Sequence, residues 1–183
     1  MLEPLGIEAV PQGSLFEGEA DEPHETFLEN ALAKAHFAAR ATGLAVMADD
    51  SGLVVPALGG APGVHSAHYA GHDGDRDTRD ARNNAKLVAA MQGVEDRRAF
   101  YYGVLVYLAG PTDPTPIVTE GLWHGEIVAE GRGAGGFGYN PHFLTTGGRT
   151  AAELEDAEKN RLSHRGQALA AMVARLKERG FAR

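Results

Sequence analysis

A short apolar run that ends in two adjacent carboxylates constrains the fold of this chain more than any other segment. Residues 44–47 (Leu-Ala-Val-Met) are typical of a buried strand, and the sequence Ala-Asp-Asp-Ser-Gly follows directly at 48–52. In α/β proteins, ligands bind at the carboxyl ends of strands, so negative charge here predicts a functional rim of a sheet. The alternative is an ordinary Asx-type turn after a strand.

Paired carboxylates with no cysteine nearby favour a hard cation. Glu22, which lies in an acidic loop, forms a candidate ligand set with Asp49 and Asp50. Oxygen ligands of this kind suit Mg²⁺, and Mg²⁺ suits phosphate-bearing substrates. Glu29 follows Thr26 at a capping-box spacing and is interpreted as a helix cap instead. For Glu22, the alternative is a solvated acidic loop.

Composition limits the class of protein. The 183 residues include no cysteine, so disulfides and Cys-ligated zinc are excluded, and a reducing, cytoplasmic compartment is predicted. No apolar stretch approaches the ~20 residues that span a bilayer, so no membrane partner is expected. The net charge of −8 argues against binding to a nucleic-acid backbone, although a local basic cluster and a metal can still hold a free nucleotide.

Helical and strand patterns alternate along the chain, which predicts an α/β fold with a mixed sheet. The second strand pair is expected to turn at the His-Gly of residues 124–125, and residues 131–138 form a glycine-dense loop. The helices are predicted from Thr26 to Gly43, over about 77–91 and from Ser163 to Gly180, and the further strands over 7–10, 98–108, 117–123 and 126–129.

Two strong hydrogen-bond donors, His164 and Arg165, lie in the first turn of the last predicted helix. The macrodipole disfavours cations there, whereas the exposed amides suit an anion or a carbonyl oxygen. These donors make sense if a ligand acceptor lies opposite them, and Lys159 lies close enough upstream to join. The alternative is that both side chains point to solvent.

The glycine-dense loop ends in two aromatic residues, Phe137 and Tyr139. Aromatic rings on such a backbone can stack on a base. The alternative is a tight loop whose rings fill the core.

Five short segments in a set order carry a resemblance that covers nearly the whole chain. They are Thr-Phe-Leu-Glu-Asn-Ala at 26–31, Ala-Asp-Asp-Ser-Gly-Leu at 48–53, Leu-Gly-Gly-Ala-Pro-Gly at 58–63, Gly-Gly-Phe-Gly-Tyr at 135–139 and Ser-His-Arg-Gly at 163–166. In these segments the chain resembles the inosine triphosphate pyrophosphatases, the Ham1/RdgB-type noncanonical purine nucleoside triphosphatases. Their order and spacing together make the resemblance specific, although each motif alone is weak.

The resemblance implies an elongated, two-lobed α/β fold with a long central mixed sheet flanked by helices, in one domain over residues 1–183 and as a homodimer. It also implies Mg²⁺-dependent cleavage of inosine, deoxyinosine or xanthosine triphosphate to the monophosphate and pyrophosphate. Asp50 is the implied general base and a metal ligand, and Glu22 is the other metal ligand. The implied substrate-binding residues are Ser51, Phe137, Gly138, Tyr139, Asn140, Lys159, His164 and Arg165.

Three departures from the family pattern accompany the resemblance. The family usually opens with a strand, a Thr-Gly-Asn-x-Gly-Lys phosphate loop and a helix, whereas residues 1–6 resemble the end of that helix. A truncation or a misplaced start is therefore expected. Asn140 stands where the family usually has Asp, and His68 stands where a basic residue is usual.

Two rival functions follow from these departures and from related folds. Without the phosphate loop, the chain would be a catalytically silent nucleotide-binding or dimerising homologue. A pyrophosphatase for modified pyrimidine nucleotides, as in the Maf group, is the other rival. His164 and Arg165 behind Ser163 argue against that second rival.

Overall fold

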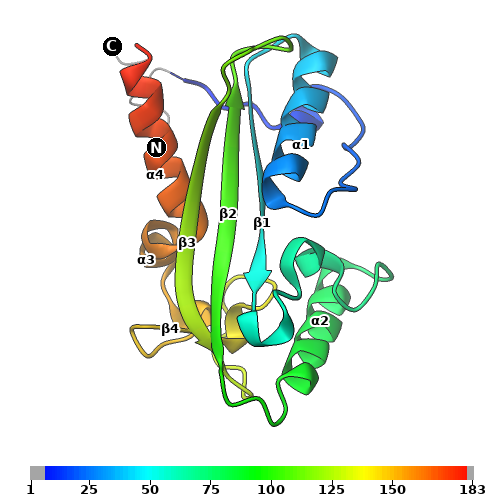
Figure 1. Cartoon of the computed structure of the whole chain (residues 1–183), viewed down its shortest axis with the longest axis vertical. Helices are drawn as coiled ribbons and strands as arrows, with labels where there is room; N and C mark the ends of the chain where they lie inside the picture. The colour runs from blue at the N-terminus through cyan, green and yellow to red at the C-terminus, as the bar shows by residue number, and fades with distance from the viewer. Residues whose placement is uncertain (1–6, 181–183) are drawn as a thin grey trace. The chain divides into compact units, whose positions relative to one another are not determined.

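The computed structural model describes residues 7–180, and the expectation for residues 1–6 lies outside them. Four strands form one sheet in chain order: β1 (Val46–Val54), β2 (Arg98–Leu108), β3 (Ile117–Ile127) and β4 (Phe143–Thr145) (Figure 1). The α/β class is confirmed. The sheet is antiparallel rather than mixed, with Ile127 opposite Phe143 in the β3–β4 pair. Short connections such as residues 109–116 between β2 and β3 permit only antiparallel pairing.

Four α-helices accompany the sheet within the described residues: α1 (Phe27–Thr42), α2 (Arg76–Ala90), α3 (Asp156–Leu162) and α4 (His164–Glu178). The predicted ends of α1 are confirmed. The Thr26 hydroxyl accepts a hydrogen bond from the Glu29 amide at 3.2 Å, and Gly43 ends the helix in the left-handed region at φ 70°.

The contacts divide the chain into two compact units. The first unit takes the chain up to Asp50, Gly103–Gly121 and the chain from His164 onward, and the second takes Ser51–Tyr102 and Leu122–Ser163. Both units include parts of β1, β2 and β3, because three of the four divisions fall inside strands.

In the first unit, α1 and α4 lie on opposite sides of the strands (Figure 1). Helix α4 buries Met172 and Leu176 against Tyr107 and Ile117. Helix α1 buries a row of small side chains spaced four apart, which lets the helix backbone pack closely. That row consists of Ala31, Ala35 and Ala39.

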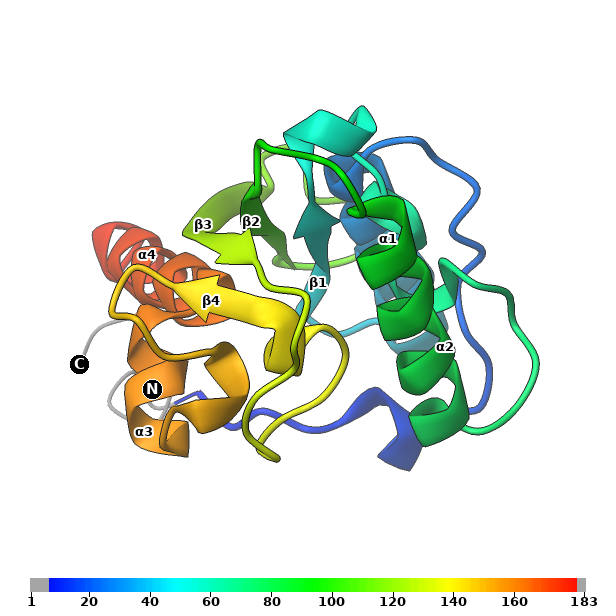
Figure 2. The ribbon, with the colours of Figure 1, turned by 90° about the horizontal axis from the view of Figure 1, so that it is seen from below.

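In the second unit, an aromatic cluster forms the core. Phe143 at the start of β4 packs against Tyr101 and Trp123, with ring centroids 4.7 Å and 5.3 Å away. Leu87 and Met91 of the α2 segment complete the cluster and are fully buried. Both β4 and α2, which are labelled in Figure 2, belong to this unit.

Three sequence predictions for strands were wrong. Residues 7–10 form no strand. β1 continues through Asp49 and Asp50 to Val54, so no turn follows Met47. β3 is continuous through His124 and Gly125, because that glycine serves close packing rather than a turn: a Cβ there would lie 2.7 Å from the Phe143 ring.

No helix among the described residues is long and apolar enough to cross a membrane.

Candidate active site

Asp49 and Asp50 lie in the middle of β1, and their side chains point to opposite faces of the strand. The Asp50 carboxylate meets Lys34 of α1, whereas the Asp49 carboxylate accepts a hydrogen bond from Arg165 of α4 at 2.9 Å. Adjacent residues of a strand alternate between faces, so the two carboxylates cannot act as one pair. The expectation of one shared acidic rim is corrected in this respect.

Lys34 joins the two predicted metal ligands. Its ammonium lies 2.8 Å from Glu22 Oε2 and 2.9 Å from Asp50 Oδ1. Asn30, which is buried, holds the acidic loop by accepting from the His24 amide at 3.1 Å and donating to the His24 carbonyl at 3.2 Å. Helix α1 therefore supplies both the cation between the carboxylates and the contact that positions the loop of Glu22.

Asp50 is the buried member of this group. Asp50 is 8% exposed, and its Oδ2 atom has no hydrogen-bond partner among the described residues. Burial raises the pKa of the Asp50 carboxyl, and the hydrogen bond from Lys34 partly opposes that rise. Burial lowers the pKa of Lys34, but the hydrogen bonds to Glu22 and Asp50 outweigh it and the net pKa is raised. Lys34 is therefore charged at neutral pH.

The donor set fits a hard cation that shares its ligands with a substrate. Within residues 7–180, no group of three or more His, Cys, Asp or Glu side chains converges as a closed metal cage. Mg²⁺ is commonly held by one or two carboxylates together with substrate phosphates. Glu22 and the unpartnered Asp50 Oδ2 match that open type of site.

His164 is buried at the first position of α4, and Arg165 follows it. Burial, aided by the charge of Arg165, lowers the pKa of His164 to about 4, so its imidazole is neutral at pH 7. Strand β3 packs closely against the same helix. The Thr119 hydroxyl donates to the Ala168 carbonyl at 2.9 Å. A Cβ at Gly121 would collide with the His164 carbonyl. The His164 donor is therefore uncharged.

The predicted aromatic loop belongs to the second unit, and its two rings have different surroundings. Phe137 is 50% exposed, and the guanidinium of Arg76 lies 4.2 Å from its ring centroid. Tyr139 is 3% exposed, and its hydroxyl donates to the Ser66 carbonyl at 2.8 Å. Tyr139 is thus a core residue, which agrees with the core-filling alternative, and only Phe137 has an exposed ring.

Asn140 and Lys159 both lie close to Gly136. A Cβ at Gly136 would collide with the Asn140 amide and lie 3.2 Å from Lys159 Nζ, and φ is +80°. The Tyr101 hydroxyl donates to Asn140 Oδ1 at 3.4 Å, and Lys159 forms an ion pair with Asp156 at 3.1 Å. Glycine is therefore required where the loop meets these two polar side chains.

The remaining predicted residues also belong to the second unit. Gly138 is bonded through both of its backbone groups to α2, and Ser51 lies half-buried in β1.

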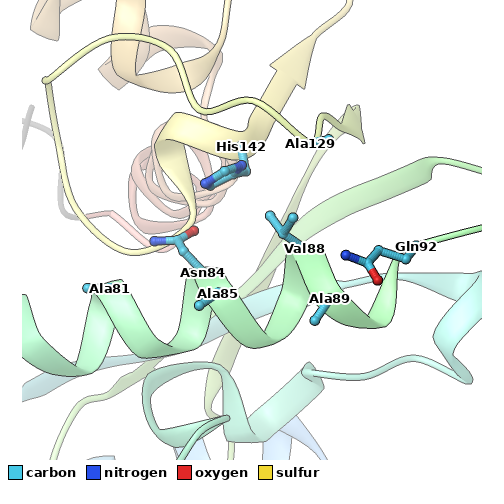
Figure 3. Close-up of a pocket in the computed structure, with 8 residues that line it drawn as sticks. All are labelled: Ala81, Asn84, Ala85, Val88, Ala89, Gln92, Ala129 and His142. Carbon is cyan, nitrogen blue, oxygen red and sulfur yellow. The ribbon is translucent and has the colours of Figure 1, made fainter.

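A shallow groove of about 530 Å³ runs along the face of α2 that lies opposite His142 and Ala129 (Figure 3). Small and polar side chains of the helix form one wall, and His142 and Ala129 form the other. None of the predicted site residues lines it. The helical wall consists of Ala81, Asn84, Ala85, Val88, Ala89 and Gln92.

Comparison with known proteins decides the family. The sequence pattern of the Ham1 family matches residues 1–175. The chain belongs to the Ham1 family. It is 59% identical over 179 residues to a dITP/XTP pyrophosphatase of Nitrosomonas europaea, covering 97% of this chain and 86% of that protein. A dITP/XTP pyrophosphatase of Burkholderia pseudomallei is 60% identical over 174 residues, covering 94% and 83%.

Solved structures of Ham1 proteins share the fold of this Ham1-family chain. A HAM1 protein from Coxiella burnetii superimposes with a TM-score of 0.90 at 43% identity, covering 97% of this chain and 89% of that one. A nucleoside-triphosphatase, dITP/XTP pyrophosphatase, from Mycobacterium abscessus gives 0.76 at 42% identity, covering 96% and 90%. The resemblance found in the sequence motifs is thus confirmed along the chain.

Sequence reasoning missed Lys34 as a site residue of this Ham1-family chain. The sequence predicts that Lys34 lies on a helix. It does not predict the contacts of Lys34, because its two carboxylate partners lie 12 residues before it and 16 residues after it. The only local signal was a lysine on an otherwise alanine-rich inner helix face. Packing of α1 on β1 turns that lysine into the partner of Asp50.

Proposed function

We propose that this protein hydrolyses noncanonical purine nucleoside triphosphates, deoxyinosine, inosine and xanthosine triphosphate, to the monophosphate and pyrophosphate. The proposal is supported by relatives at 59% and 60% identity that are named dITP/XTP pyrophosphatases. The observation that carries it is the buried Asp50 carboxylate, which has one oxygen on Lys34 and the other unpartnered. A carboxylate of this kind suits proton abstraction from water.

We assign Asp50 as the general base that orients and deprotonates the attacking water. A raised pKa makes a carboxylate a stronger base, and Lys34 opposes part of the rise that burial causes. Glu22 and Asp50 would hold Mg²⁺, which when bound neutralises charge on the phosphate oxygens. Lys34, bonded to both carboxylates, would fix the direction of the Asp50 lone pairs.

The base is read by donors at the start of α4. We propose that Arg165, with neutral His164, donates hydrogen bonds to a purine 6-oxo group. An adenine presents an amino donor at that position, so two donors would oppose each other and remain unpaired. Such a mismatch can reject a substrate by several orders of magnitude. Phe137, the exposed ring of the second unit, is the proposed stacking surface.

The rival function is a catalytically silent nucleotide-binding homologue. It is less well supported, because the predicted base and its charged neighbours are all present and the compared relatives are named as enzymes.

The deciding experiment measures pyrophosphate release by the purified chain from dITP, XTP, dATP and dUTP, with Mg²⁺ and with EDTA. We expect release from dITP and XTP that requires Mg²⁺. Binding of dITP without pyrophosphate release under any metal condition would establish the silent homologue instead. Preferred release from dUTP would favour the pyrimidine-directed rival.

We also propose that the protein works in the cytoplasm as a homodimer. The absence of cysteine from its 183 residues suits a reducing compartment. On β3, the exposed face carries Val118 and Leu122, which are 38% and 39% exposed, with the charged Glu120 between them. Exposed apolar side chains of this kind suit an interface. Sedimentation velocity tests the dimer: Val118→Lys should yield monomer, whereas a wild-type monomer would contradict the proposal.

A further inference from the structure

Three side chains on one face of α2 contact a single dipeptide of the glycine-rich loop. Arg76, Asp80 and Asn84 are spaced four apart, so they form a row along the helix. The Arg76 guanidinium stacks over the Phe137 ring at 4.2 Å. Asp80 Oδ2 accepts from the Gly138 amide at 2.7 Å, and Asn84 Nδ2 donates to the Gly138 carbonyl at 2.9 Å.

This row of α2 residues contacts a ring that lies outside the aromatic core cluster. Phe137 is 50% exposed and is not a member of the aromatic core cluster of the second unit. Its neighbours Gly136 and Gly138 both have positive φ, at 80° and 62°, which glycine adopts without the steric cost that other residues bear. Two hydrogen bonds to the following residue and one guanidinium stack connect this part of the loop to α2.

Two of the three α2 side chains contact the loop backbone, and the third contacts the Phe137 ring. Asp80 and Asn84 fix the backbone of Gly138, and Asn84 is tied to its own helix by a second bond to the Asp80 carbonyl at 2.9 Å. The Arg76 guanidinium contacts the ring. A planar guanidinium stacked on an aromatic face restricts rotation of that ring and is worth little as surface stabilisation.

We propose that Arg76 is a positioning residue for the substrate base, acting through the orientation of Phe137. The inference rests on the proposed function, specifically on Phe137 as the stacking surface for a purine. A ring already held in place loses less conformational freedom when the base stacks on it, so Arg76 increases affinity for the nucleotide. Arg76 contacts no part of the triphosphate in this scheme, so the chemical step is unaffected.

The test compares Arg76→Ala with wild type in dITP hydrolysis. A loss of the stack is expected to raise KM about two- to five-fold with kcat unchanged. Arg76→Lys keeps a cation over the ring and should restore part of the loss. Arg79→Ala is the matched control, because Arg79 lies on the same helix and donates to the Gly74 carbonyl instead. Melting temperatures of all variants should match wild type.

A double-mutant cycle with Phe137→Ala separates positioning from a direct contact. If Arg76 acts through the ring, Arg76→Ala has no further effect on KM once Phe137 is alanine. An undiminished effect in that background, or no effect of Arg76→Ala alone while wild type hydrolyses dITP, would overturn the inference. Failure of wild type to hydrolyse dITP would instead overturn the proposed function.

Discussion

At the scale of single residues, the burial of Asp50 lowers the stability of the fold and indicates a functional role for this carboxylate. The fold raises the pKa of this carboxyl by burial, so ionising it costs folding free energy above that pKa. A residue kept in this state at a cost to stability is typical of an active site.

Replacing Asp50 with Asn should therefore abolish most activity without destabilising the protein. The expected loss in kcat for dITP is about 10²- to 10⁴-fold, the usual contribution of a positioned base. The melting temperature should stay equal or rise, because a buried charge is removed. Asp96→Asn, at an exposed aspartate bonded to Arg98, is the control and should leave kcat unchanged. Turnover of Asp50→Asn near the wild-type value would contradict the assignment.

The two donors at the start of α4 govern base choice in the proposed function. His164→Ala and Arg165→Ala should each lower the preference for ITP over ATP by roughly 1–3 kcal/mol, because a hydrogen bond to the 6-oxo group is lost. The measurement is the ratio of kcat/KM for the two nucleotides. Arg175→Ala on the same helix, where Arg175 pairs with Glu178, is the control. Unchanged ratios in both variants would show that these side chains do not read the base.

At the scale of elements, the loop that carries Phe137 depends on glycine. Gly136→Ala adds a side chain at φ +80° and brings it into collision with Asn140 and within 3.2 Å of Lys159 Nζ. We expect kcat/KM for dITP to fall about tenfold to a hundredfold, since small displacements at a binding site cost that much.

Gly148→Ala provides the matched control for this loop. Gly148 has φ +79° but open space around its Cβ position, so it carries the same backbone strain without the collision. Equal losses of kcat/KM in the two variants would show that backbone strain alone, rather than packing against Asn140 and Lys159, explains the requirement.

At the scale of the whole molecule, buried His164 makes stability depend on pH. Its pKa is about 4 in the folded state and near 6.5 when unfolded, so the unfolded chain binds the proton more readily. The stabilisation is therefore complete above pH 6.5 and is lost as pH falls toward 4. At pH 5 the loss is roughly 2 kcal/mol.

The measurement compares wild type with His164→Gln in thermal unfolding at pH 7.5 and pH 5. The wild-type melting temperature should fall further than that of the variant, by about 4–8 °C for a chain of this size. His124→Gln, at an exposed histidine, should retain the wild-type pH dependence. Parallel decreases in wild type and His164→Gln would exclude this origin of the pH effect.

Local signals in the sequence determined the α/β class, the membership in the Ham1 family and several element boundaries. Thr26 and Gly43 bound α1 as predicted, and β2 matches its predicted range of 98–108, since caps and alternation depend on neighbouring residues alone. The turn predicted at Gly125 was wrong. A glycine at a turn and a glycine at a close packing contact look the same in the sequence, and Gly125 is of the second kind.

Only the tertiary structure decided the surroundings of the predicted site residues. Packing of α1 and α4 on opposite faces of β1 separates Asp50 from Asp49 and brings Lys34 to the former. The same packing buries His164 and makes its imidazole neutral at pH 7. Burial and partners are supplied by segments far apart in the chain. Short-range sequence patterns therefore identified these residues without determining their charge or their contacts.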